Sequence, residues 1–566
     1  MNTSACKKSV LILVPAILIL AYGVFRTSAG LEAHMDIRFY DESYYLCQGL
    51  FQPIASWVAD YSVLYSLFYK GLSLIAGTDA VSLYYLSYRI WAFVLAFLVF
   101  FILWKRGVHL GLCMVWALCS LSAEINYPLW PKAGHLAMLG VALALFGMQK
   151  LGSKNPAAWL WNSGICLLLS WCRPEFLAGF IPGIAVFFVL VFRNRKAPFS
   201  FPFWVVLPVL VSLVCIGIWG IPGGDSGRGL VAFGQHYVHN WRNISGRNQG
   251  DLMWDWVNWR EIFYHDFPGA SNFFEALLIN PSAFFSHIFF NAKYLIYKAF
   301  VYFFESLIPN RWLALPVTYT VAFCWLLLEI SEKFEGAGRW LRQYRPLSGR
   351  LFHPVWILIF PSFLSGLLFQ PRPHYLIPWF PVFLWVLGGF LSCFTLPQIG
   401  LRWKKIFSVA SVSLILILLP DASAFFQIQE KGSHAERSFL SSFNFFEPET
   451  REDLRQKLLI RQLQELPWPA QTVLFDASTG AADFLGTRVE RKGKTGFEMN
   501  YDELSDFESF IKKEKVNAIF IRPSTIHYDR QINAQPFWQK LRARPATEGW
   551  RKLPVGTFGD SLLIRP

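Results

Sequence analysis

Long apolar runs recur along this chain, and they constrain its fold more than any other feature of the sequence. A helix that crosses about 30 Å of hydrocarbon needs roughly 20 mostly apolar residues. The runs that approach this length are 9–25, 83–104, 107–123, 133–148, 156–172, 176–192, 201–221, 312–328, 351–369, 375–395 and 406–420. The sequence therefore predicts a polytopic α-helical membrane protein with about eleven transmembrane helices.

The composition excludes several other classes of protein. Hydrophobic residues make up 54% of the 566 residues and charged residues only 16%, whereas soluble domains carry about 25% charged residues. A disordered chain, a collagen-like chain and a single water-soluble globule are therefore excluded. The nine cysteines lie mostly within apolar runs and include no CxxC pair, a pattern that fits neither a disulfide framework nor a zinc site.

The net charge of +14 follows membrane topology and does not indicate a nucleic-acid partner. Proteins that bind DNA gather their cations on one solvated face, whereas here Lys and Arg fall in short clusters between the apolar runs. With the N-terminus inside, seventeen Lys and Arg lie in inside segments, and the three short outer turns hold only Lys132, Arg173 and Arg372. The positive-inside rule then predicts a cytoplasmic N-terminus and an outward-facing C-terminus.

Two long segments between the runs are predicted to face outward and to form loop helices there. Residues 26–82 are polar and rich in tyrosine, and residues 222–311 form the second outer segment. Within it, residues 284–305 are apolar but interrupted by a histidine, an asparagine and two lysines. Counting this stretch as a span would place the basic segment 333–350 outside, so we expect an amphipathic helix along the membrane interface.

The composition becomes that of a soluble domain near the C-terminus, which divides the chain into a transmembrane domain, 1–421, and an outer α/β domain, 422–566. Ser505 with Glu508 fits a capping box that opens a helix running to about Lys515. The domain has no GxGxxG and no P-loop, so no nucleotide is assigned to it. Its expected strands are 472–477, 516–521 and 561–564.

Adjacent acids, Asp41 and Glu42, follow the first span in an aromatic loop that includes Tyr45 and is preceded by Arg38. A carboxylate at this position would take a proton from an acceptor hydroxyl as a general base. Binding of a divalent cation, Mg²⁺ or Mn²⁺, by Asp41 and Glu42 is an alternative. A solvated loop that happens to contain two acids is the structural alternative.

Each cation of the short outer turns has polar neighbours on the same side of the membrane as Asp41. For any one of them, snorkelling to headgroup phosphate is a sufficient explanation. Together they predict an anion pocket, because Arg binds phosphate oxygens bidentately and Lys adds a point charge. The three groups are Lys132 with His135, Arg173 with Glu175, and Arg372 with His374 and Tyr375.

His236 and His239, with His265 and Asp266 later in the chain, have a spacing that permits metal binding. No third ligand is fixed by the sequence, and a metal site needs at least three protein ligands. Histidines that support the structure or contact a substrate are the alternative, so a metal requirement is left open.

The order and sidedness of these features resemble those of a known enzyme family. The resemblance is carried by the Asp41-Glu42 pair after an N-terminal anchor, the stretch 60–77, the Arg173–Glu175 turn and the Arg372–Pro378 segment. It covers about residues 1–420 and is to the GT-C membrane glycosyltransferases, specifically to the bacterial branch similar to protein O-mannosyltransferases and the lipid A aminoarabinose transferase.

The resemblance implies a polyprenyl-phosphate-linked sugar donor and a lipid, glycan or protein acceptor that meet at the periplasmic face of a bacterial inner membrane. By match, Asp41 would be the catalytic base of an inverting transfer, and Glu42 would support the loop or a cation. Arg173, Arg372 and Tyr375 would bind the lipid phosphate. Many relatives carry an acid near the start of the fourth span where this chain has PKAGH, so roles for Lys132 and His135 rest on charge placement.

Two other functions handle similar ligands and stay open at this point. A flippase or transporter of lipid-linked sugars predicts charged residues within the spans, and apart from Arg89 near a span end such residues are scarce here. A polymerase or ligase of lipid-linked polysaccharide would use diphosphate-linked chains, so identification of the donor would separate it from a monosaccharide transferase.

Overall fold

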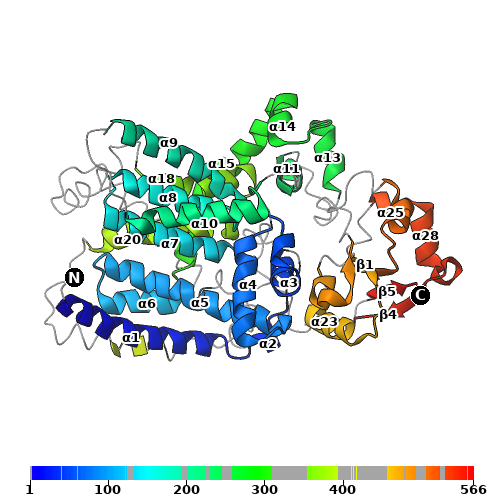
Figure 1. Ribbon diagram of the computed structural model, residues 1–566, viewed down its shortest axis with the longest axis horizontal. Helices are drawn as coiled ribbons and strands as arrows, with labels where there is room; N and C mark the ends of the chain where they lie inside the picture. Colours follow the sequence, from blue (N-terminus) through cyan, green and yellow to red (C-terminus); the bar gives the residue numbers. More distant parts are fainter. Residues whose placement is uncertain are drawn as a thin grey trace.

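The computed structural model shows a bundle of helices, a group of short helices across one end of it, and a small α/β domain beyond them (Figure 1). The residues it describes are 3–37, 39, 41–59, 61–121, 123, 133–153, 155–193, 202–223, 228–244, 258–308, 353–392, 409–410, 412–413, 416, 455–476, 480–492, 505–522, 530–556 and 559–565.

Five helical segments of the described chain are long and apolar enough to cross a membrane. They are Ile12–Ala33 (α1, Thr3–Thr27, continuing into α2, Leu31–His34), α5 (Ala80–Lys105), α7 (Ala133–Leu151), Pro174–Arg193 (η3, Pro174–Phe176, with α9, Leu177–Arg193) and Pro373–Ser392 (α19, Pro373–Leu376, η4, Ile377–Trp379, and α20, Phe380–Ser392). The prediction of a polytopic helical membrane protein is therefore confirmed.

Four further predicted spans form apolar helices that are shorter than a full crossing. These are α6 (Leu110–Leu121), α8 (Pro156–Leu169), α10 (Phe203–Trp219) and α18 (Trp356–Leu368). The predicted span 312–328 lies outside the described residues, and so does most of 406–420. A total of eleven spans stays a prediction.

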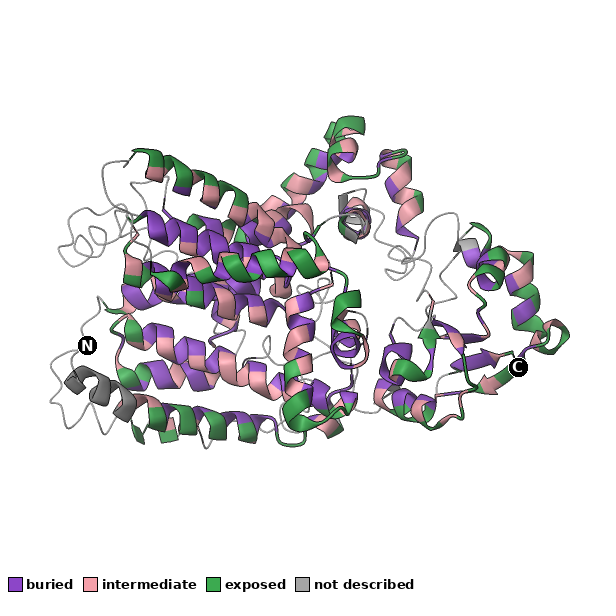
Figure 2. Cartoon of the chain, viewed as in Figure 1, coloured by how far each residue is buried: buried purple, intermediate pink, exposed green. Residues whose placement is uncertain are grey.

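The outer surface of the bundle is apolar. Figure 2 shows α7 and α8 buried inside, whereas α9 and α10 expose much of their surface. The side chains exposed there are large and apolar, for example Ile181 at 65% and Val214 at 62%. Contiguous apolar surface of this kind marks contact with a membrane or a partner, and on helices of this composition it indicates lipid.

Helix α15 (Pro281–Glu305) meets α14 (Phe273–Ile279) at a bend of 116° and packs against α18, and its place along the membrane interface stays a prediction. His287 and Asn291 are 0% and 1% exposed. His287 Nε2 lies 2.8 Å from the carbonyl oxygen of Leu368, at the end of α18, and Asn291 Nδ2 donates to the Leu367 carbonyl, also at 2.8 Å. The last carbonyls of a helix lack intrahelical partners, so these two side chains cap α18.

Short helices stand across one end of the bundle (Figure 1). The predicted outer loop 26–82 is largely helical, with α3 (Asp41–Phe51), η1 (Ile54–Ser56) and α4 (Val63–Ala76). The second outer segment contains α11 (Arg228–Ile244) and α13 (Trp259–Asp266). The starts of α5 and α7 and the ends of α8 and α18 lie at this same end: the Leu64 amide donates to the Trp171 carbonyl at 3.2 Å, and Cys172 Sγ donates to the Ala133 carbonyl at 3.2 Å.

The C-terminal domain is built on a five-stranded sheet of order β2-β1-β3-β5-β4. Strand β1 is parallel to β2 and β3, whereas β5 is antiparallel to β3 and β4. Its elements are α23 (Arg455–Glu465), β1 (Val473–Asp476), η6 (Ala482–Arg488), β2 (Glu490–Arg491), α25 (Phe507–Lys513), β3 (Ala518–Ile521), α27 (Arg530–Asn533), α28 (Pro536–Ala543), η7 (Pro545–Glu548), β4 (Arg551–Pro554) and β5 (Ser561–Ile564).

The three predicted strands are confirmed as β1, β3 and β5. The helix predicted to open at Ser505 is α25. Its predicted start is one residue early, because Asp506 rather than Ser505 caps it. The Asp506 carboxylate accepts a hydrogen bond from the Ser509 amide at 3.0 Å. An Asp N-cap serves as well as Ser, so the two adjacent residues compete for the position.

Candidate functional site

Asp41 and Glu42 are the first two residues of α3 and do not lie in an irregular loop. Consecutive residues of an α-helix point about 100° apart. Glu42 accordingly turns inward and is fully buried, whereas Asp41 is half-buried at the start of the helix. The negative charge of Asp41 at this position is favoured by the helix dipole, and Asp41 is the acid of the pair that a substrate can reach.

Glu42 joins α3 to α4. Its Oε1 accepts hydrogen bonds from the hydroxyls of Tyr65, at 2.8 Å, and Tyr69, at 2.5 Å. The Tyr69 hydroxyl also lies 3.0 Å from Ser87 Oγ of α5. Burial raises the pKa of both tyrosines well above the usual value, and the Glu42 charge raises it further, so both stay protonated and donate. Glu42 therefore fixes the start of α3 against two helices.

Glu42→Ala is expected to destabilise the protein strongly. The substitution leaves the Tyr65 and Tyr69 hydroxyls buried without their acceptor, at about 1–3 kcal/mol for each unsatisfied group. The loss is measured as a lower midpoint of thermal unfolding in detergent. Glu42→Gln keeps one carbonyl oxygen and should lose clearly less, and equal midpoints for Glu42→Ala and the wild type would contradict the anchoring role.

A divalent cation held jointly by Asp41 and Glu42 does not fit this geometry. The two side chains diverge along α3, and Glu42 Oε1 already accepts two hydrogen bonds in the interior. Among the residues that the structure describes, no three His, Cys, Asp or Glu side chains are grouped as metal ligands, and this includes the histidines of α11. We therefore derive no step through a metal.

Arg173 is held from two sides at the turn between α8 and η3. Its Nε pairs with Glu175 Oε1 at 2.5 Å, and its guanidinium lies 4.7 Å from the centre of the Tyr375 ring. Pro174 starts η3 and so fixes the short spacing between the two charged residues. The ion pair uses Nε alone, so the two terminal nitrogens, which form the fork that binds phosphate, are not part of it.

Arg372 and Tyr375 stand at the start of the tenth predicted span, where α18 has ended and α19 begins. The Tyr375 ring stacks on Phe369 at 5.7 Å and lies 4.3 Å from the His374 ring. Burial lowers the pKa of Arg372 to about 10, so its guanidinium is still charged at neutral pH. A buried cation of this kind is a strong binding group for an anion.

The outer-turn residues and the acidic helix start converge at Tyr375. Its hydroxyl lies within electrostatic reach of four charged groups from three separate segments: Arg173 and Glu175, Arg372, and Asp41. Gly134 at the start of α7 packs against the same place, because a Cβ at this position would lie 2.8 Å from the His374 carbonyl. The structure thus brings the predicted base and three of the predicted phosphate-binding residues, Arg173, Arg372 and Tyr375, to one site.

His236 of α11 closes a further side of this site. Its ring lies 6.1 Å from the Tyr375 ring, and its Nδ1 accepts a hydrogen bond from the Gln370 amide at 3.4 Å. Burial lowers the pKa of His236 well below its usual value, and the Arg372 charge lowers it further, so it accepts in its neutral form. Gln370 in turn donates to Asn240 at 3.0 Å, which links α11 to the segment that carries Arg372.

Lys298 is a residue of this site that the sequence did not indicate. It lies one helical turn after Leu295 and two turns after Asn291, on the face of α15 that packs against α18 and α19. The charge of Lys298 interacts with that of Arg372. In the sequence it is only one of four interruptions of an apolar run. The signal that would have found it is the spacing of these interruptions, because Asn291 and Lys298 share one helical face.

Of the remaining predicted residues, two are buried among aromatic rings and two lie outside the described chain. Tyr45 is 5% exposed and packs against the Tyr65 ring between α3 and α4. His135 is 4% exposed, and its ring lies 6.1 Å from that of Trp91. Lys132 and Arg38 fall outside the described residues.

Comparisons with known proteins find a likeness in structure but none in sequence. No protein-family model matches the chain, and no curated protein matches it. Among solved structures, the chain is similar to the oligosaccharyltransferase of Archaeoglobus fulgidus, which was crystallised tethered to an acceptor peptide containing the NVT sequon via a disulfide bond. The identity is 12%, the match covers 97% of this chain and 73% of that chain, and the TM-score is 0.31.

Proposed function

We propose that this protein is a membrane glycosyltransferase of the GT-C type. It transfers a single sugar from a polyprenyl-phosphate donor to a hydroxyl or phosphate of a lipid, glycan or protein acceptor at the periplasmic face of a bacterial inner membrane. The observation that carries the proposal is the packing of Arg173 against the Tyr375 ring, 4.7 Å from its centre, within electrostatic reach of Arg372 and Asp41 at one end of an apolar helical bundle.

The reaction is a single displacement at the anomeric carbon. Asp41 takes the proton of the acceptor hydroxyl, and the acceptor oxygen forms a bond to the anomeric carbon. The bond from that carbon to the phosphate oxygen breaks, and its electron pair leaves on the polyprenyl phosphate. Attack opposite the leaving group inverts the anomeric configuration, and the transition state has oxocarbenium character, as in other glycosyl transfer.

The cations have their largest effect on the leaving phosphate. Negative charge builds up on the phosphate as the bond breaks, and fixed cations in a site with little water stabilise such charge strongly. Arg372 and the terminal nitrogens of Arg173 would bind the phosphate oxygens, with Tyr375 as a hydroxyl donor between them. Glu175 holds Arg173 in place through its ion pair, and Lys298, when protonated, would add a further positive charge beside Arg372.

Mass spectrometry of envelope glycans and lipids from a deletion strain tests this function. Complementation with the wild-type gene is expected to restore a mass increment of one sugar, and the increment identifies the class of sugar. Purified protein in nanodiscs should then catalyse the same transfer from a synthetic polyprenyl-phosphate sugar. Movement of the donor across liposomes without transfer would instead support a flippase, and activity only with diphosphate-linked chains would support a polymerase or ligase.

A further inference from the structure

The segment before α3 caps a helix of the C-terminal domain. Asp36 Oδ2 accepts a hydrogen bond from the Gln456 amide at 2.9 Å, and Oδ1 accepts one from the Lys457 amide at 3.0 Å. These amides belong to the first turn of α23, whose N–H groups have no intrahelical partner. Asp36 is 9% exposed and thus acts as an N-cap supplied from 420 residues away in the sequence.

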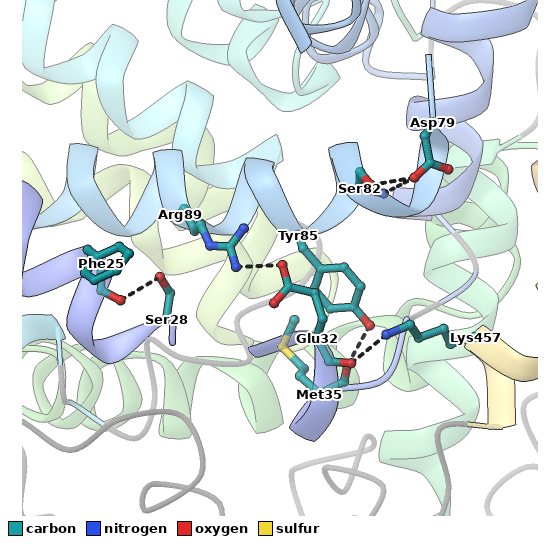
Figure 3. Close-up of polar contacts among 9 residues, drawn as sticks. All are labelled: Phe25, Ser28, Glu32, Met35, Asp79, Ser82, Tyr85, Arg89 and Lys457. Atoms are coloured by element: carbon teal, nitrogen blue, oxygen red, sulfur yellow. Dashed lines mark hydrogen bonds and ion pairs between the residues drawn. The ribbon is translucent and has the colours of Figure 1, made fainter. Parts of the chain in front are cut away.

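The same segment is tied to the bundle on its other side. Figure 3 shows Arg89 of α5 paired with Glu32, at 2.6 Å, and the Tyr85 hydroxyl donating to the Met35 carbonyl, at 2.7 Å. Lys457 of α23 donates to the Glu32 carbonyl, also at 2.7 Å. Residues 32–36 are therefore held between the second predicted span and the C-terminal domain.

Two further contacts with the C-terminal domain flank Asp41 in the sequence. Ser43 Oγ donates to Asp483 Oδ2 at 3.0 Å, and the Phe39 and Phe484 rings lie 6.0 Å apart. Asp483 and Phe484 belong to η6, the next helix after β1 in the chain. Asp41 lies between these contacts in the sequence, so the C-terminal domain holds the chain on both sides of it.

The C-terminal domain makes these contacts at the carboxyl ends of its central strands, where α/β domains bind ligands. The connection after β1 leads to β2 on one side of the sheet, whereas the connection after β3 leads to β4 at the opposite edge. This divergence makes a topological switch point at the carboxyl ends of β1 and β3, where open α/β sheets bind their ligands. Arg522, directly after β3, lies 5.7 Å from the Phe39 ring and donates to Gln456 Oε1 at 2.7 Å.

Packing makes this contact continuous. One apolar cluster contains buried residues of α3, such as Leu46 and Leu50, together with buried residues of the C-terminal domain, such as Leu459 and Leu474. Gly486 of η6 has a φ of 61°, and a Cβ there would lie 2.9 Å from the Phe51 ring at the end of α3. The domain is thus fitted along the whole length of α3.

We propose that the C-terminal domain is a positioning element of the catalytic site. The switch point of its sheet binds Asp36, Phe39 and Ser43 at the place where other α/β domains bind a ligand. These contacts set the direction in which α3 presents Asp41. This proposal rests on the proposed role of Asp41 as the base. Asp36 is a positioning residue, since it acts through α3.

Asp36→Ala and Asp506→Ala form a matched pair that tests the proposal. Both remove an Asp N-cap from a helix of the C-terminal domain, but α25, which Asp506 caps, does not touch α3 in the contacts described. In nanodiscs, Asp36→Ala is expected to lower kcat at least tenfold with the donor KM within twofold of wild type. Asp506→Ala should keep the wild-type kcat. Asp36→Asn keeps one of the two acceptor oxygens that cap α23 and should lose less kcat than Asp36→Ala.

Hydrogen exchange separates this inference from the proposed function, because it needs no activity. In the full-length protein, Asp36→Ala should raise exchange at the start of α23 and also in α3, whereas Asp506→Ala should raise it in α25 alone. Unchanged exchange in α3, or equal losses of kcat in Asp36→Ala and Asp506→Ala, would overturn the positioning role. If the wild type transfers no sugar from any donor, the proposed function fails while the exchange result still decides whether the domain orders α3.

Discussion

Asp41→Asn is expected to reduce sugar transfer to an acceptor hydroxyl by about 10²- to 10⁴-fold, the usual range for loss of a general base. The amide cannot take a proton, but it keeps the size of the side chain and its place at the start of α3. Donor binding should stay within a few-fold of wild type, because the phosphate contacts come from other segments. Initial rates at saturating donor, with donor affinity measured separately by thermal shift, check both parts.

Asp79→Asn is the matched control for this substitution. Asp79 lies at the same end of the bundle, where it caps α5 by accepting a hydrogen bond from the Ser82 amide at 3.1 Å. Asn is an equally good N-cap, so this variant should keep both its stability and its rate. Transfer at the wild-type rate by Asp41→Asn would show that another group is the base, and would bring the transporter interpretation forward.

The helical membrane fold could be predicted because its signals are local. Apolar runs of sufficient length have few alternatives to a helix in lipid, and the cations of the outer turns stand out against the positive-inside pattern. Short apolar runs likewise predicted β1, β3 and β5. What these signals share is that each can be read within about 20 consecutive residues.

The contacts that the sequence leaves open depend on partners that are distant in the sequence. The resemblance implies that Glu42 supports the loop or a cation, but only the structure shows that its partners are two tyrosines of another helix. The polar residues of α15 predict polar surroundings without identifying them. Here those surroundings are the carbonyls that end α18. Asp36 could not be assigned for the same reason, since its partners lie 420 residues away.

Arg372→Gln is expected to raise the donor KM by about 10- to 100-fold, because hydrogen bonds to charged groups contribute about 1.5–3 kcal/mol each. The substitution keeps a polar side chain of similar length, so the contact of this segment with Gln370 and α11 can persist. Arg372→Lys keeps the charge but loses the planar fork, and should fall between wild type and Arg372→Gln. Titration of a polyprenyl-phosphate sugar into protein in nanodiscs measures the change.

Arg106→Gln is the control for Arg372→Gln, since Arg106 is also a bundle arginine against an aromatic ring, 4.7 Å from Trp385, but at the other end of α5. It should leave the donor KM unchanged.

Lys298→Gln should weaken donor binding less than Arg372→Gln, and the double variant should depart from additivity if both cations contact one phosphate. A change in the acceptor KM alone would place Arg372 in the acceptor site, and additive effects would assign Lys298 to a different anion.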